Sequence, residues 1–206
     1  MTKQAAQGQL ERYANLMQEI KERTLSIEPV VNGKTGLYGP LAREFCYLQL
    51  RLICECIALS CLVAHDDLKS IQSSKFQTEF AADLLIKKLE TLHPDFYPHP
   101  VRFTILEDHV HVAEMTEDYL KKSELVKLVR QCGDKLHRGS ARKYTFSPTQ
   151  EELENDFEQV MTSAKKVLRL LEQHKVNLSS GVEYTFCILS YGPDAKVQVF
   201  SGGPKK

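Results

Sequence analysis

The sequence has no net charge, no glycine-rich phosphate loop and no apolar run long enough to span a membrane. Its 206 residues include 27 Lys and Arg and 27 Asp and Glu. Overall basicity therefore gives no reason to expect a nucleic-acid-binding protein. No apolar run reaches about 18 residues, and the first residues lack an apolar signal region. We therefore expect a cytoplasmic protein with no membrane association.

The six cysteines do not form a pattern typical of disulfides or zinc. Four of them, Cys46, Cys54, Cys56 and Cys61, fall within one apolar stretch. Without a signal region, a disulfide framework is not expected. The spacing also lacks the two ligand pairs of a usual zinc site. We predict buried thiols, with no metal and no cofactor.

Hydrophobic periodicity predicts a mainly α protein with about five helices. In the first, at Thr2–Arg23, apolar residues recur at spacings of four and three. Pro29 and three glycines then predict a loop over residues 27–39. The other helices are expected at Pro40–His65, at Lys75–Glu90, from Ser123 to Leu136, and from Ser147 to Leu171. The last of these opens with Ser147 and Gln150 in the arrangement of a capping box.

Two segments of alternating apolar and polar residues predict β-hairpins, at residues 101–115 and 182–200. They could pair into a small sheet beside the helices. His109 and His111 would share a face of the first hairpin, and with no third ligand nearby a solvated face is the simpler interpretation. The fold class is thus α+β and mainly α, and the length favours a single domain over residues 1–206.

The stretch at residues 128–139 combines reactive side chains, helical spacing and local charge. Arg130 and His137 are seven residues apart, almost two helical turns, so both should project from one face about 10 Å apart along the axis. The apolar residues of this helix lie on the opposite side, which predicts that Arg130, Asp134 and His137 face solvent, a partner or a cleft. Residues 121–143 hold eight Lys and Arg against two acidic residues, a locally basic segment.

Arg51 and Glu55 form a charged pair within the apolar second helix. They are four residues apart and should face each other. A charge on a buried helix must be paired or must border a cleft. An internal or surface ion pair is one explanation, and a supporting position beside an active-site cleft is the other.

A helical bundle with a late Arg130-x6-His137 resembles the HEPN superfamily, whose pattern is an arginine, four to six residues, and a histidine. The resemblance covers Thr2–His174 and leaves both hairpins unexplained. It implies metal-independent RNA cleavage at a site where two protomers bring their motifs together. It therefore also implies a homodimer, in a defence or toxin system with an antitoxin as a protein partner.

The side chains of this segment suit the chemistry that the resemblance implies. Histidine can accept the proton of a ribose 2′-hydroxyl or protonate a leaving oxygen, and arginine can hold the phosphate. Asp134 could orient His137 or partly neutralise Arg130. The cationic residues expected to attract the RNA backbone are Lys135, Arg138, Arg142 and Lys143.

Two functions without catalysis explain the same residues. In a helical interaction or scaffold protein, the face from Arg130 to Arg142 would bind a protein partner or remain hydrated. In a noncatalytic RNA-binding or nucleotide-binding protein, it would hold phosphates. A serine or cysteine enzyme has less support, because no such nucleophile stands in a recognisable motif.

Overall fold

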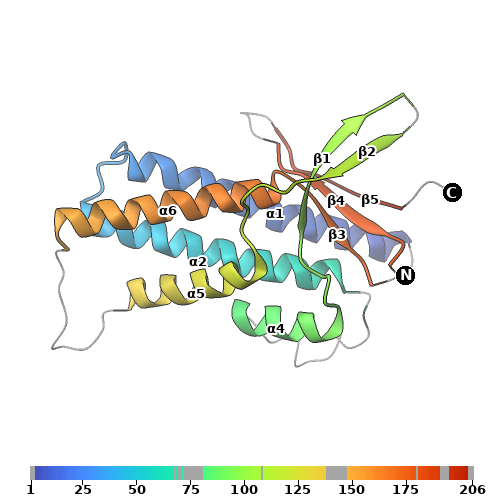
Figure 1. Ribbon diagram of the computed structural model, residues 1–206, viewed down its shortest axis with the longest axis horizontal. Helices are drawn as coiled ribbons and strands as arrows, with labels where there is room; N and C mark the ends of the chain where they lie inside the picture. Colours follow the sequence, from blue (N-terminus) through green and yellow to red (C-terminus); the bar gives the residue numbers. More distant parts are fainter. Residues whose placement is uncertain are drawn as a thin grey trace.

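A computed structural model of the chain shows an elongated helical bundle with a small sheet at one end (Figure 1). It describes residues 3–66, 68, 71, 81–107, 109–137, 148–179, 181–190 and 195–203. The helices are α1 (Lys3–Val31), α2 (Gly39–Ala64), α4 (Ala82–Leu92), α5 (Lys122–Leu136) and α6 (Gln150–Leu171). The strands are β1 (His99–Ile105), β2 (Val110–Glu114), β3 (Gln173–Asn177), β4 (Tyr184–Ile188) and β5 (Gln198–Gly202). The predicted fold class, mainly α with a small sheet, is confirmed.

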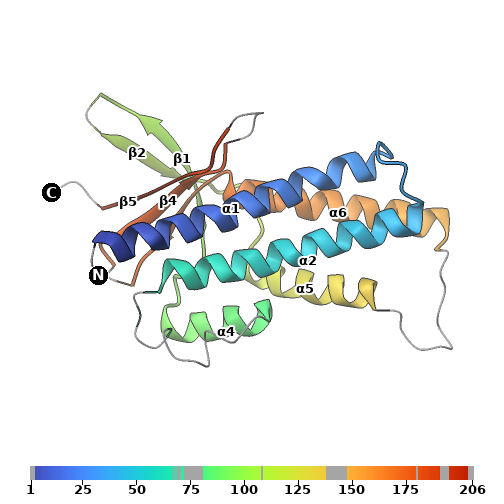
Figure 2. The same cartoon turned by 180° about the vertical axis from the view of Figure 1, so that it is seen from behind.

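Helix α2 is the centre of the bundle. It packs against α1, α4, α5 and α6, and seen from behind it runs beside α1 over nearly its full length (Figure 2). By length and composition α2 could cross a membrane, but 67% of its most apolar window is buried inside the protein. All six cysteines are buried and free, as predicted for the four in this helix. The high hydropathy of α2 is therefore explained by its burial among the other helices.

The predicted loop at residues 27–39 is wrong in its first part, because α1 continues through Pro29. Ile27 and Val30 are almost fully buried, and this apolar burial offsets the hydrogen bond that proline cannot donate. The helix ends at Val31, and Gly33 two residues later has a φ of 69°. The N–H groups of Gly33 and the next residue donate to the carbonyls of Val30 and Pro29, at 3.0 and 2.9 Å, in a Schellman motif.

The starts of two helices differ from prediction. The described part of the predicted helix at 75–90 is α4, which begins at Ala82, and residues 75–80 lie outside the described residues. Helix α6 is capped by Thr149 and not by Ser147, which is also outside them. The Thr149 side chain accepts from the backbone N–H of Glu152 at 3.2 Å, and the Glu152 carboxylate accepts from the backbone N–H of Thr149 at 2.8 Å. The charged carboxylate suits the helix N-terminus better than the glutamine of the predicted box.

The sheet has the strand order β2-β1-β3-β4-β5, with every neighbouring pair antiparallel. The two predicted hairpins are confirmed as β1–β2 and β4–β5. Strand β3 was not predicted, and it lies between the hairpins and joins them. It pairs with β1 only at His99 and Pro100, so the β1–β2 hairpin extends away from the rest of the sheet (Figure 1).

A buried pair, Tyr13 and His174, connects α1 to β3. The Tyr13 hydroxyl lies 2.7 Å from His174 Nε2, and His174 Nδ1 lies 3.0 Å from the carbonyl oxygen of Leu171. Because Nδ1 faces a carbonyl, we assign it the ring hydrogen, so Nε2 accepts the hydroxyl hydrogen. Both ring nitrogens are satisfied in the neutral form, and burial lowers the pKa of His174 to about 4.

We expect this histidine to make the fold sensitive to acid. Below its ordinary pKa of 6.5 the unfolded chain binds a proton, while folded His174 stays neutral until about pH 4. Neutral His174 therefore makes its full contribution to the free energy of unfolding above pH 6.5. That free energy falls as the pH drops, by about 2.5 kcal/mol at pH 4.5. Urea unfolding between pH 7 and 4.5 should show this slope in the wild type and a flatter one in His174→Gln. Equal slopes in the two proteins would contradict the assignment.

Candidate functional site

Helix α5 carries three of the nine predicted site residues, Arg130, Asp134 and Lys135, and it ends one residue before a fourth, His137. Its stripe of Leu125, Leu128 and Cys132 is buried and packs against α2. A residue on the opposite side of a helix from such a stripe must be exposed. Arg130, Asp134 and His137 are indeed exposed, as predicted.

Arg130 and His137 lie near the end of α5. His137 is the C-cap, with φ −73° and ψ 134°, and its backbone N–H donates to the carbonyl of Gly133 at 2.9 Å. Their backbones are separated by about 10 Å along the helix axis. In the part of the chain that the structure describes, the side chains of Arg130, Asp134 and His137 form no hydrogen bond or ion pair. Asp134 thus neither orients His137 nor neutralises Arg130 directly within this chain.

Of the four cationic residues expected to attract RNA, only Lys135 is described. Arg138, Arg142 and Lys143 lie outside the described residues. The Lys135 ammonium lies 2.6 Å from a carboxylate oxygen of Asp156 on α6. Lys135 therefore already has an anionic partner within the protein.

The Asp156 carboxylate joins three helices. Besides Lys135 of α5, it accepts from Arg43 Nε at 2.5 Å and from the Tyr47 hydroxyl at 2.8 Å, both on α2. Its side chain is only 7% exposed. Burial by itself raises the pKa of Asp156, but the hydrogen bonds from Lys135 and Tyr47 and the Arg43 charge outweigh it, and the pKa is lowered overall. Asp156 is therefore an anion that fixes the setting of α5 against α2 and α6.

Arg51 and Glu55 form the expected ion pair, with 3.1 Å between Arg51 Nε and the Glu55 carboxylate. The pair is partly exposed, at 42% and 29% of the two side chains. Arg51 also lies beside α5: burial raises the pKa of Cys132 to about 12, and the positive charge of Arg51 acts in the opposite direction. Arg51 thus borders the helix of the candidate site, while Cys132 remains a protonated thiol.

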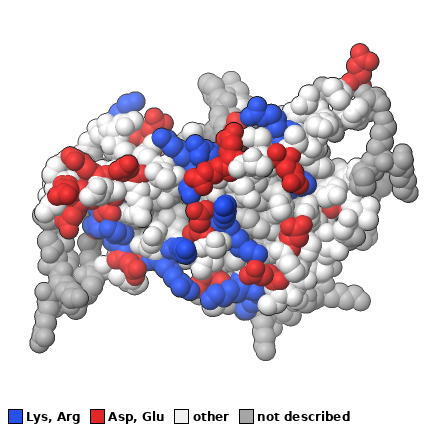
Figure 3. All heavy atoms as spheres, in the orientation of Figure 1, with Lys and Arg blue, Asp and Glu red and all other residues white. Residues whose placement is uncertain are grey.

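A groove of about 550 Å³ runs between α5 and α6. Charged side chains surround it: Lys and Arg gather along α5, and Asp and Glu gather over the first half of α6 (Figure 3). The residues that line the groove are Leu120, Glu124, Lys127, Leu128, Gln131, Asn155, Asp156, Glu158, Gln159, Thr162, Ser163 and Lys166. Sequence reasoning missed this groove because its two walls come from separate helices that no shared motif connects.

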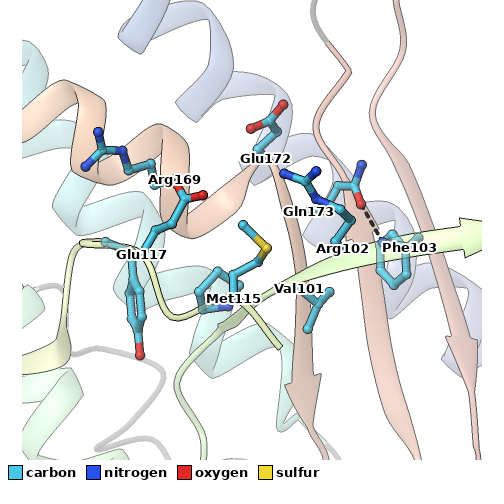
Figure 4. Close-up of a pocket in the computed structure, with 10 residues that line it drawn as sticks. Val101, Arg102, Phe103, Met115, Glu117, Arg169, Glu172 and Gln173 are labelled. Carbon is cyan, nitrogen blue, oxygen red and sulfur yellow. Dashed lines mark hydrogen bonds between the residues drawn. The ribbon is translucent and has the colours of Figure 1, made fainter. Parts of the chain in front are cut away.

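A second cavity of about 400 Å³ lies where the β1–β2 hairpin meets the end of α6 (Figure 4). Its charged side chains are Arg102, Glu117, Arg169 and Glu172, two of each sign. Arg169 donates to the backbone carbonyl of Asp118 at 3.0 Å. The cavity contains none of the predicted site residues.

The described residues contain no group of three or more His, Cys, Asp or Glu side chains arranged for a metal ion. His111, on β2, is exposed.

In comparisons with known proteins, no family model, curated protein or solved structure matches the chain. Function is therefore argued from the site alone.

Proposed function

We propose that the protein binds RNA through the exposed face of α5, and that two copies together cleave it without a metal ion. One observation carries the proposal: Arg130 on α5 and His137 at its C-cap are both exposed, with no competing partner among the described residues. An unpaired arginine can bind a phosphate, and an unpaired histidine can transfer a proton. The fixed setting of α5 holds the two groups in place.

In the proposed reaction, His137 accepts the proton of a ribose 2′-hydroxyl. The 2′-oxygen attacks the adjacent phosphorus, the bond from phosphorus to the 5′-oxygen breaks, and the leaving oxygen takes a proton from His137 of the second copy. Arg130 stabilises the charge that develops on the phosphate. Because the 2′-hydroxyl is the nucleophile, the reaction acts on RNA and spares DNA, and accessible single strands are the best substrates.

We place this activity in the cytoplasm, as part of a defence or toxin system. The burial of α2 inside the bundle supports this placement, because its apolar surface is used by the other helices. A protein partner such as an antitoxin would act by covering the α5 face. The homodimer is a requirement of the shared site, since about 10 Å separates Arg130 from His137 within one chain.

A noncatalytic interaction protein is the alternative, and one feature favours it. Just before α2 and within its first ten residues, four large apolar side chains are well exposed, namely Leu37, Tyr38, Leu41 and Leu48. Protein contact surfaces are often rich in exposed apolar side chains. In this alternative the α5 face contributes charge to a protein complex and leaves RNA intact.

Replacing Arg130 with alanine tests the RNA-binding proposal. We expect the Kd for a fluorescent single-stranded RNA in EDTA, with 2′-O-methyl groups that block the proposed cleavage, to rise about tenfold, because one charge-assisted phosphate contact is lost. The plot of log K against log salt concentration should also become less steep, by about one unit of slope, because one phosphate contact is lost. Arg102→Ala, which removes an exposed arginine from β1, is the matched control and should bind as the wild type does. Absence of RNA binding by the wild type would favour the interaction protein.

A further inference from the structure

The α5–α6 groove has two polar walls over an apolar floor. Helix α5 contributes Lys127 and Gln131, and α6 contributes Asn155 and Thr162. The floor is Leu120 and Leu128, which are 2% and 4% exposed. Because these two leucines are almost fully covered, a ligand in this groove would mainly meet the polar side chains of the two walls.

Several polar groups of the groove are not used by the fold. Glu124 and Lys166 bond to each other at 2.8 Å, Asp156 holds its three donors, and Ser163 donates to the carbonyl of Gln159 at 2.9 Å. In contrast, the side chains of Lys127, Gln131, Asn155 and Thr162 form no hydrogen bond or ion pair within the described residues. Two carboxamides, a hydroxyl and an ammonium thus remain for a ligand.

From this arrangement we infer that the groove binds one nucleotide of the RNA strand held by α5. A carboxamide has a hydrogen-bond donor and an acceptor side by side. The edge of a nucleobase carries a matching acceptor and donor. Gln131 and Asn155 can form hydrogen bonds with the base from opposite walls of the groove. Lys127 supplies the cation for the phosphate, and Glu158 on the α6 wall disfavours a phosphate on that side.

This inference rests on the proposed function, and it extends the same site. Gln131 directly follows Arg130 on α5, and adjacent helical side chains diverge by about 100°. A strand whose phosphate contacts Arg130 can therefore turn a neighbouring base over the edge of α5 into the groove. The groove would give the protein a preference among bases, which phosphate contacts alone do not provide.

The test compares binding of single-stranded oligo(A), oligo(C) and oligo(U) RNA in EDTA, each with 2′-O-methyl groups that block the proposed cleavage. The wild type should prefer one of them. In the double variant Gln131→Ala and Asn155→Ala, the affinity for that RNA should fall about tenfold and the three affinities should become equal. Both replacements are at exposed helical positions and keep helix propensity. The control is Gln7→Ala with Asn15→Ala, two exposed positions on α1, which should retain the preference.

The outcomes separate the groove from the α5 face. Arg130→Ala should lower the affinity for all three RNAs by the same factor, whereas the groove variant should lower only the affinity for the preferred RNA. If the groove variant keeps the wild-type preference while Arg130→Ala still weakens binding, the groove inference is wrong and the RNA-binding proposal remains. If the wild type binds none of the three RNAs, both are wrong. A wild type that binds all three equally also overturns the groove inference.

Discussion

Replacing Asp156 with alanine is expected to lower the free energy of unfolding by about 3 kcal/mol. Removal of a buried ionic partner leaves its donors uncompensated, which typically costs about 3 to 5 kcal/mol. The side chains of Arg43 and Lys135 are 21% and 36% exposed, so water can replace part of the interaction that they lose with the carboxylate. We therefore expect the lower end of this range. The Tyr47 hydroxyl, whose pKa is raised by burial and by the neighbouring carboxylate, loses an acceptor as well.

Urea unfolding at pH 7 measures this loss. Glu158→Ala is the matched control, because it removes a carboxylate from an exposed position on the same helix and should change stability by less than about 0.5 kcal/mol. Asp156→Asn keeps the shape and one acceptor but not the charge, so it should fall between the two. A loss below about 1 kcal/mol for Asp156→Ala would show that the carboxylate does not hold the three helices together.

Replacing His137 with alanine is expected to reduce RNA cleavage by at least about 100-fold. A positioned general acid or base typically contributes about 10² to 10⁴ in rate, and His137 serves in both roles in the proposed dimer. RNA binding should change little, because the substitution leaves Arg130, the residue proposed to hold the phosphate, in place. The measurement is single-turnover cleavage of a single-stranded RNA in EDTA, with the Kd of the same RNA carrying 2′-O-methyl groups determined in parallel.

The control for this experiment is His111→Ala, which removes an exposed histidine from β2 and should cleave at the wild-type rate. Equal cleavage by the wild type and His137→Ala would point to a contaminating nuclease and against the assignment. Sedimentation at micromolar concentration tests the shared site separately. A protein that is monomeric there, yet cleaves RNA, would require a site within one chain.

The helices were predictable because each carries its own local pattern. The stripe of Leu125, Leu128 and Cys132 alone determines which side of α5 is buried, and therefore that Arg130 is exposed. The end of α1 was not predictable from Pro29, because buried Ile27 outweighs the local preference of proline. Tertiary burial decided that boundary.

Two features could not be predicted because they depend on contacts distant in sequence. Strand β3 places His174 at a buried position where a strand pattern would have an apolar residue. The two ring nitrogens of His174 are satisfied by the Leu171 carbonyl and by the Tyr13 hydroxyl, and Tyr13 is 161 positions away in the sequence. Likewise Asp156 belongs to an acidic run that the helix dipole explains on its own, and the sequence does not show that Arg43, 113 positions earlier, is its partner.

The bond between Tyr13 and His174 also bears on how the chain folds during synthesis. The two residues are 161 positions apart, so the ribosome must make most of the chain before they can meet. By then the five helices have been made and can pack against one another, but the surface of α1 that contacts the sheet stays open to water. Such long-range closure slows folding and leaves early intermediates prone to aggregation. The last 30 or so residues, which contain β3, β4 and β5, therefore complete the core as well as the sheet.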